Sequence, residues 1–172
     1  MTRVSVRLAS SEEDIQTART LCREWLDWHW DNYPADWPKG DDHPMDPVGF
    51  QKILSDLPNL HKRPLGGILI ASVDGKPCGC VMYNQASAGV AEFKRMFVSA
   101  EGRGHGLGRK MLGQMFEQMA TDGYTRVFFS SATFLTHARK MYVNAGFLPM
   151  SHPADFPDDW RDKVYFMERS LT

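Results

Sequence analysis

The sequence predicts an α/β protein with a mixed sheet. Three observations carry this prediction: stretches in which apolar residues alternate, stretches in which they recur at helical spacing, and turns rich in glycine, proline or aspartate between them. The chain has 172 residues, 42% of them apolar, which is enough for one well-packed core and too few for two. We therefore expect a single domain over residues 1–172, with strands and helices in the order β-α-α-β-β-β-α-β-α-β.

The N-terminal part predicts one strand followed by two helices. Residues 4–8 alternate like a strand. Two serines and two glutamates at 10–13 form a helix start, and apolar residues then recur at helical spacing to about residue 29. A loop rich in proline, aspartate and tryptophan covers 33–47, and loops of that length often carry function. Residues 50–57 predict a second, short helix.

The rest of the chain predicts a hairpin, three more strands and two more helices. The hairpin joins residues 67–73 to 78–83 through an Asp-Gly turn. The later elements, in chain order, are a strand at 91–98, a helix from Leu107 to about Thr121 that Asp122 and Gly123 end, a strand at 127–129, a helix at 138–144 and a strand at 164–167.

Composition argues against several classes of protein. The formal net charge is −1, so no overall field attracts nucleic acid or an anionic membrane. Cys22, Cys78 and Cys80 form neither an even disulfide set nor a metal quartet, and we expect them to be small apolar fillers in a reducing compartment. The N-terminus lacks the apolar core of a signal peptide, and no run of about 18 apolar residues could span a bilayer. We expect a cytoplasmic protein with no metal, no nucleic-acid partner and no membrane partner.

One turn, Arg-Gly-His-Gly-Leu-Gly at 103–108, carries the most chemical information. It lies between a predicted strand and an amphipathic helix, where unpaired backbone N–H groups and the positive end of the helix dipole converge. Glycine lets a phosphate approach these groups, and the turn has glycine at Gly104, Gly106 and Gly108. Positive charge is added by Arg103, Arg109 and Lys110. The turn therefore predicts a pyrophosphate site.

Other phosphate-binding loops fit this turn less well. A dinucleotide-binding G-x-G-x-x-G would need glycine where the chain has Leu107 or Arg109. A P-loop needs Gly-Lys followed by Ser or Thr, which does not occur near the turn. The remaining alternative is a glycine turn that only packs the helix on the strand, because short glycine patterns recur by chance.

Two segments of the chain occur in a specific order and spacing. The first is R-x-x-G-x-G at 103–108, preceded by A-E-F-K-R-M-F-V and followed by the amphipathic helix. The second is A-R-K-M-Y-V-N-A-G-F at 138–147. Together they resemble the two conserved segments of the GNAT superfamily of N-acetyltransferases. The resemblance implies one GNAT-type domain with a mixed, mostly antiparallel central sheet, flanked by helices and splayed at the acetyl-CoA site.

The resemblance implies acetyl-CoA as the co-substrate, with no metal. The main chain of Phe97 and Val98 would pair with the pantetheine arm, and the N–H of Val98 would polarise the thioester carbonyl. The pyrophosphate would be surrounded, largely by backbone amides, by Arg103, Gly104, Gly106, Gly108 and Arg109. Many members carry an asparagine seven residues before the family tyrosine, where this chain has Leu135, so Thr136 or His137 would have to replace its hydrogen bond to the cofactor arm.

Two side chains are implied as catalysts. Glu92 falls where several members keep a carboxylate general base, and an amine with a pKa of about 10 must lose a proton before it attacks a thioester. The alternative is a sheet glutamate paired with Lys94 or Arg95. Tyr142 falls at the family tyrosine, which can protonate the departing thiolate, whose pKa is near about 8.5. The alternative is that its ring only packs against pantetheine.

The acceptor side combines aromatic and acidic residues. Family members bind the acceptor between the first two helices, their connecting loop and a late loop. That first region contains Trp25, Trp28, Trp30, Tyr33, Trp37, Asp27, Asp31, Asp36, Asp41 and Asp42. One interpretation is a pocket for a cationic amine, with Trp28, Asp31 and Tyr33 as candidate substrate residues. The other places Trp25 and Trp28 in the core and the aspartates in solvent. Acidic residues at 155–159 slightly favour the first.

The leading hypothesis is direct transfer of an acetyl group from acetyl-CoA to a primary amine in a ternary complex. The acceptor would be a small-molecule amine or a peptide. The rival is a non-catalytic acyl-CoA-binding sensor, against which Glu92 and Tyr142 together argue. The sequence leaves open the acceptor, the acyl-chain preference and whether the protein forms a homodimer.

Overall fold

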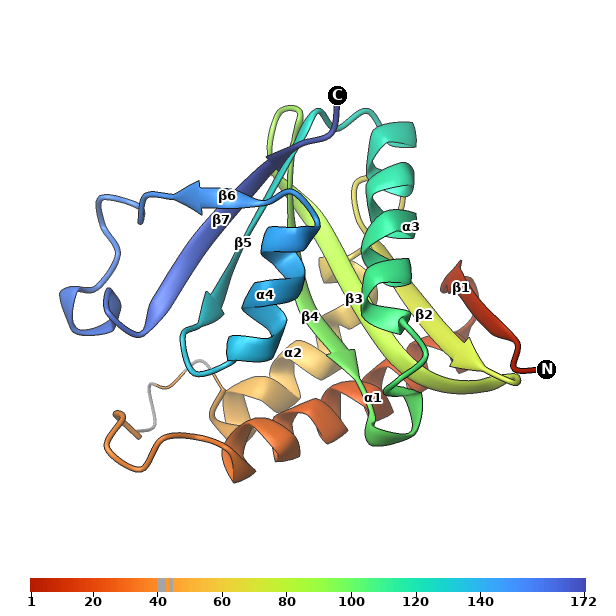
Figure 1. The fold of residues 1–172 in the computed structure, drawn as a ribbon, viewed down its shortest axis with the longest axis horizontal. Coiled ribbons are helices and arrows are strands. Elements are labelled where there is room, and N and C mark those ends of the chain that lie inside the picture. Colours follow the sequence, from red (N-terminus) through yellow and green to blue (C-terminus); the bar gives the residue numbers. More distant parts are fainter. Residues whose placement is uncertain (40–42, 44) are drawn as a thin grey trace.

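The computed structural model describes residues 1–39, 43 and 45–172, and it shows a seven-stranded mixed sheet with helices on both faces (Figure 1). The strands and helices, in chain order, are β1 (Val4–Leu8), α1 (Glu12–Asp31), α2 (Pro47–Leu60), β2 (Gly67–Val73), β3 (Lys76–Ser87), β4 (Val90–Val98), the 3-10 turn η1 (Ala100–Gly102), α3 (Leu107–Thr121), β5 (Arg126–Ala132), α4 (Thr136–Asn144), β6 (Leu148–Met150), the 3-10 turn η2 (Asp158–Trp160) and β7 (Val164–Ser170).

The sheet has the strand order β1-β2-β3-β4-β5-β7-β6. Every neighbouring pair is antiparallel except β4 and β5, which are parallel. The predicted α/β class with a mixed, mostly antiparallel sheet is therefore confirmed. The structure adds β6, a three-residue strand that the sequence analysis did not predict.

Local side-chain caps determine where the first two helices begin. The Ser11 hydroxyl accepts a hydrogen bond from the Asp14 N–H at 3.1 Å and caps α1. The Asp46 carboxylate accepts from the N–H groups of Val48 and Gly49, both at 3.0 Å, and Pro47 occupies the first position of α2. The second helix therefore starts three residues earlier than its apolar pattern predicts.

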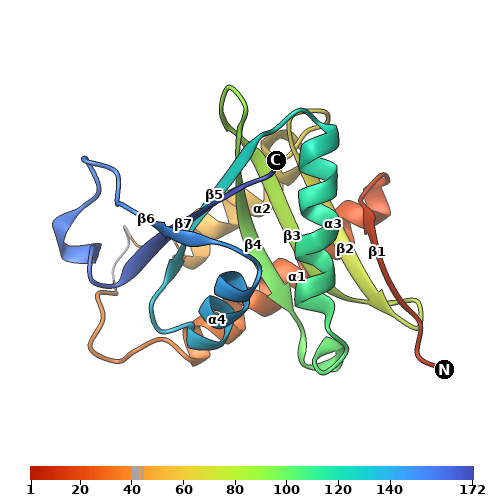
Figure 2. The same ribbon diagram turned by 45° about the horizontal axis from the view of Figure 1, so that its top comes forward.

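The helices form one layer on each face of the sheet. Helices α3 and α4 lie on one face and α1 and α2 on the other, as Figure 2 shows. A buried cluster that includes Met111 and Phe129 fills the α3/α4 layer, and one that includes Leu21 and Phe50 fills the α1/α2 layer. The three cysteines are buried free thiols, as predicted. No helix in the described part of the chain is both long and apolar enough to cross a membrane.

Strand β4 contains a bulge that reverses the facing of its side chains. Lys94 pairs with Met82 and Phe97 pairs with Cys80, so β4 has one residue more than β3 between these pairs. The bulge contains Arg95, which has a positive φ of 53°. Before it, Phe93 packs in the α3/α4 layer; after it, Phe97 packs in the α1/α2 layer.

Strands β4 and β5 separate soon after they begin, and we call the resulting opening the fork. They pair only at Val90–Arg126, Ala91–Val127 and Glu92–Phe128. Beyond this point β4 stays paired with β3, and β5 stays paired with β7. Figure 1 shows the two strands diverging toward the end where α4 lies over them. The sheet is thus splayed between its two parallel strands.

Candidate active site

The glycine turn connects the end of β4, through η1, to the first turn of α3. Gly104 and Gly106 have φ values of +82° and +69°, a conformation in which most side chains would be strained. A Cβ at Gly108 would lie 2.6 Å from the sulfur of Met141, so the flexible Met141 side chain would have to move to accept a larger residue there. Two glycines therefore shape the turn, and the third lies against the Met141 side chain of α4.

The backbone amides of this turn have few internal partners. The Arg103 N–H donates to Ala100 O at 3.4 Å, and the Lys110 N–H donates to Gly106 O at 3.1 Å. Between them, the amides of residues 104–109 donate to no acceptor in the described part of the chain. They lie at the N-terminus of a 15-residue helix. This arrangement presents N–H groups and the positive end of a helix dipole to an anion.

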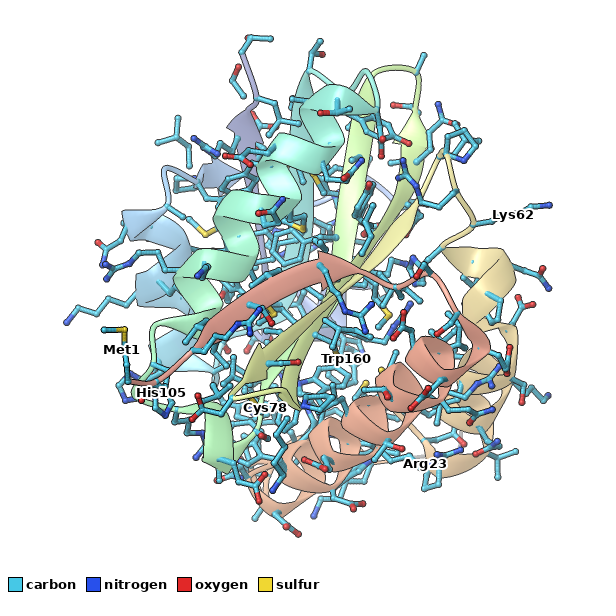
Figure 3. All side chains as sticks on the ribbon, turned by 90° about the vertical axis from the view of Figure 1, so that its right-hand side faces the viewer. Met1, Arg23, Lys62, Cys78, His105 and Trp160 are labelled. Atoms are coloured by element: carbon cyan, nitrogen blue, oxygen red, sulfur yellow. The ribbon has the colours of Figure 1, made fainter. Side chains whose placement is uncertain are left out.

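Positive side chains surround the turn on the surface. The side chains of Arg103, His105 and Arg109 are exposed, and Figure 3 labels His105 at the outer edge of the molecule. The Lys110 ammonium donates to Val4 O at 3.3 Å and is thereby tied to β1. An anion at the turn would therefore meet backbone amides first, with the exposed guanidinium groups of Arg103 and Arg109 around them.

The end of β4 offers one unpaired edge at the fork. Phe97 pairs with Cys80 and Val98 with Gly79, both of β3. On the opposite side neither residue has a strand partner among the residues that the structure describes, because β4 and β5 have already separated. An extended ligand group could therefore lie along Phe97 and Val98 in place of a strand.

Tyr142, on α4, lies deep in the layer above the fork. Only 5% of it is exposed, and its ring lies 4.3 Å from that of Phe129 and 5.6 Å from that of Phe93, between ring centroids. Burial raises the pKa of the Tyr142 hydroxyl above its ordinary value, and Tyr165 adds to the rise. The hydroxyl therefore keeps its proton at neutral pH. This fits both the acid role and the packing role that the sequence left open.

Glu92 lies where the fork begins, as the last residue of β4 that pairs with β5. Its Oε1 is 3.6 Å from the Lys94 ammonium, and the two side chains are 21% and 43% exposed. Arg95 does not join this pair: its guanidinium lies 2.5 Å from His61 Nε2 and donates to Met82 Sδ at 3.1 Å. Of the two sheet partners considered for Glu92, the structure therefore shows Lys94.

Leu135 immediately precedes α4, and no side chain caps this helix. Thr136 and His137, the two candidates to replace the family asparagine, are exposed. The structure brings neither into a described hydrogen bond with the fork.

Seven ring side chains from separate segments meet beyond the end of β5. We call them the aromatic cluster, which consists of His29, Trp30, Tyr33, Trp37, His43, Phe134 and Trp160. Of the candidate substrate residues, Tyr33 belongs to it. Trp28 instead packs against the α1/α2 core, and Asp31 is exposed. Asp41 and Asp42 lie outside the described residues.

Four members of the cluster were not among the candidate substrate residues named from the sequence: His29, His43, Phe134 and Trp160. Phe134 follows β5, and Trp160 belongs to η2, so each is far in sequence from α1. Only the density of rings around the first loop was visible in the sequence. Which later rings join them depends on the tertiary fold.

The aromatic cluster contains two histidines, which differ in their hydrogen bonds. His43 Nδ1 accepts from the Met45 N–H at 2.9 Å, so its Nε2 carries the proton and donates to the Tyr33 hydroxyl at 3.1 Å. His29 is 6% exposed, and neither of its ring nitrogens has a hydrogen-bond partner among the described residues. Burial, with a smaller effect from His43, lowers the pKa of His29 to about 4. His29 is therefore neutral at pH 7.

Comparison with known proteins agrees with this geometry. The model of the acetyltransferase (GNAT) family matches residues 22–147. A GNAT-family acetyltransferase from Staphylococcus aureus Mu50 is similar with a TM-score of 0.73 at 15% identity, over 99% of this chain and 100% of that one. An acetyltransferase from Streptococcus agalactiae 2603 gives 0.69 at 19%, over 95% and 96%. The ribosomal-protein-S18-alanine N-acetyltransferase from Escherichia coli gives 0.65 at 13%, over 100% and 95%.

These identities are low enough that the solved structures show the shared fold alone. No curated protein sequence matches the chain significantly. The family match covers most of the chain, including β4, the glycine turn and the helix that carries Tyr142. The chain therefore belongs to the GNAT acetyltransferase family.

Proposed function

We propose that the protein transfers an acetyl group from acetyl-CoA to a primary amine by direct attack in a ternary complex. Members of its family transfer acetyl groups from an acyl-CoA. The observation that carries the proposal is the fork, whose β4 arm leads directly into a turn with six amides that have no internal acceptor among the described residues. A pyrophosphate and an extended arm attached to it match these two features in order.

The residues around the turn and the end of β4 fit acetyl-CoA, which supplies the acetyl group as an activated thioester. Gly104, Gly106 and Gly108 leave the amides of 104–109 accessible, with Arg103 and Arg109 beside them. Phe97 and Val98 would pair with the pantetheine arm through their main chain. The Val98 N–H would stabilise negative charge on the thioester oxygen.

Proton transfer is assigned to one residue on each side of the fork. Glu92 would take a proton from the incoming ammonium, directly or through a water, after its ion pair with Lys94 opens. Such a partly exposed pair costs little to break, about 1 kcal/mol or less. Tyr142 would donate its proton to the departing thiolate, and its raised pKa keeps that proton available throughout the neutral range.

A thiol-release assay with acetyl-CoA and a panel of amines tests the proposal. We expect amine-dependent release, and a Tyr142→Phe variant that loses roughly tenfold or more in turnover while its affinity for acetyl-CoA is nearly unchanged. Loss of cofactor binding with normal turnover would contradict the role of Tyr142. Tight acetyl-CoA binding without release on any amine would instead favour the non-catalytic sensor.

A further inference from the structure

The aromatic cluster lies where a group attached to the attacking amine would extend. Phe134 follows the end of β5, one arm of the fork, by two residues. Phe97, on the other arm, packs in the same layer as α1, and the C-terminal end of α1 carries His29 and Trp30. The cluster therefore lies beside the end of the β5 arm, and α1 connects it to the layer in which Phe97 packs. Figures 1 and 2 show the loop after α1 approaching the connection between β6 and β7, which brings Trp160 to Trp37.

The aromatic cluster exposes the surfaces of aromatic rings to a ligand and carries little charge. Trp30, Tyr33, Trp37, Phe134 and Trp160 are half-buried, so part of each ring faces solvent. Beneath them lie the two buried histidines, and burial lowers the pKa of both. The described aspartates of this region, Asp27, Asp31 and Asp36, are exposed. A polycation would find no buried carboxylate among the described residues of the cluster.

The two nitrogens of His29 are a second, independent sign that the cluster binds a ligand. A buried imidazole without hydrogen-bond partners costs stability, and native proteins keep few such groups without a reason. His29 lies 5.3 Å from Phe134 and 5.6 Å from both Trp30 and Tyr33, between ring centroids. A polar atom that enters among these rings would find a donor and an acceptor there.

We infer that the acceptor is an arylalkylamine, whose aromatic ring stacks on the aromatic cluster while its amine reaches the fork. This inference rests on the proposed acetyl transfer and names its substrate class. Offset and edge-to-face contacts between aromatic rings are favoured beyond the area they bury, so the cluster should distinguish an aromatic ring from a saturated ring of the same size.

Matched amines test the inference on the wild-type enzyme. The value of kcat/KM is measured for 2-phenylethylamine, for 2-cyclohexylethylamine and for spermidine. The first two have the same chain and charge and differ in aromaticity. We expect 2-phenylethylamine to exceed 2-cyclohexylethylamine by about three- to tenfold, with spermidine the poorest substrate. Equal values for the two ring compounds, or a preference for spermidine, would overturn the inference and leave acetyl transfer standing. If no amine caused release of the thiol, both the arylalkylamine inference and the proposed acetyl transfer would be wrong.

Variants then assign the preference to the cluster. Phe134→Leu and Trp160→Leu remove a ring but keep an apolar side chain, and each should bring the ratio of the two kcat/KM values close to one. The matched control is Phe156→Leu, because Phe156 is a half-buried ring in the same late connection that packs on His152 and Phe166, outside the cluster. The control should keep the wild-type ratio, and all three variants should keep the KM for acetyl-CoA. A ratio unchanged by both cluster variants would overturn the assignment.

Discussion

Glu92 shows how a single residue can have two explanations that only kinetics separates. Its position at the start of the fork suits a general base, and its ion pair with Lys94 suits an ordinary sheet glutamate. The family resemblance could place this carboxylate, because its distance along the chain from the glycine turn is short. The partner could not be selected from sequence, because Lys94 and Arg95 are both adjacent and the bulge sends Arg95 toward His61.

A pH–rate profile of Glu92→Gln decides between these roles. At pH 7 we expect kcat/KM for the amine to fall roughly 100-fold, because the ammonium form then lacks a base. The deficit should shrink as the pH approaches about 10, where the amine arrives already deprotonated. Lys94→Gln is the matched control, since it removes the other half of the ion pair and should not lower the rate. A constant, small deficit across the profile would assign Glu92 a structural role.

At the scale of elements, the helices and strands were predicted from the sequence more completely than the contacts between individual side chains. The long, strongly periodic segments became α1, α3 and the strands of the hairpin. Strand β6 was missed because it has three residues, includes Pro149 and lacks alternation that could be recognised. The start of α2 was missed by three residues because its N-terminal cap, rather than its apolar pattern, sets the first turn.

Gly106 and Gly113 should respond oppositely when each is replaced by alanine. Gly106→Ala places a side chain at a φ of +69°, which costs about 1–2 kcal/mol or reshapes the turn, and we expect a raised KM for acetyl-CoA. Gly113 lies inside α3, and a Cβ added there would meet nothing within 4 Å. Gly113→Ala should therefore stabilise the fold by about 0.5–1 kcal/mol and leave the KM unchanged. Denaturant unfolding and steady-state kinetics measure both; identical behaviour of the two variants would contradict the assigned shape of the turn.

At the scale of the whole molecule, two neutral histidines are buried, His29 in α1 and His61 directly after α2. Burial lowers the pKa of His29 to about 4, and burial together with the Arg95 charge lowers that of His61 to about 4. Both values lie below the ordinary histidine pKa of 6.5, so the unfolded chain binds these protons first as the pH falls. The histidines therefore reduce stability progressively from about pH 6.5 down to about pH 4, and not above this range.

The expected loss is at most about 1.4 kcal/mol per pH unit for each histidine. His29→Phe keeps a ring in the aromatic cluster and removes one titrating group, so it should flatten the dependence of the free energy of unfolding on pH within this window. The control is His137→Phe, on the exposed surface of α4. Urea unfolding at several pH values makes the comparison, and an unchanged slope for His29→Phe would show that His29 is accessible to protons in the folded state.

The aromatic cluster could be predicted from the sequence only in part. Rings near the first loop could be counted in the sequence, but Phe134 and Trp160 reach them only because the end of β5 lies beside α1 and the β6–β7 connection lies beside the loop after α1. Long-range contacts of this kind depend on strand order, which neither periodicity nor turn residues determine. That residues 1–172 make one domain, and that Trp28 and Asp31 contact the acceptor, stay predictions.

The additional residue in β4 has a consequence for which changes of chain length the protein can accept. In a regular strand Phe97 would face the same layer as Phe93, and Val98 would face the other. Without the bulge, a strand of the present length would therefore exchange the facing of both residues, and each core would receive a side chain shaped for its opposite. Deleting Arg95 would instead remove the extra residue and leave both residues facing the layers they face now. Insertions and deletions should be tolerated at the surface turn around Gly89, whereas a deletion of two residues between Lys94 and Phe97 should exchange the facing of Phe97 and Val98. Relatives of different total length should therefore keep this short interval or lack only its one extra residue.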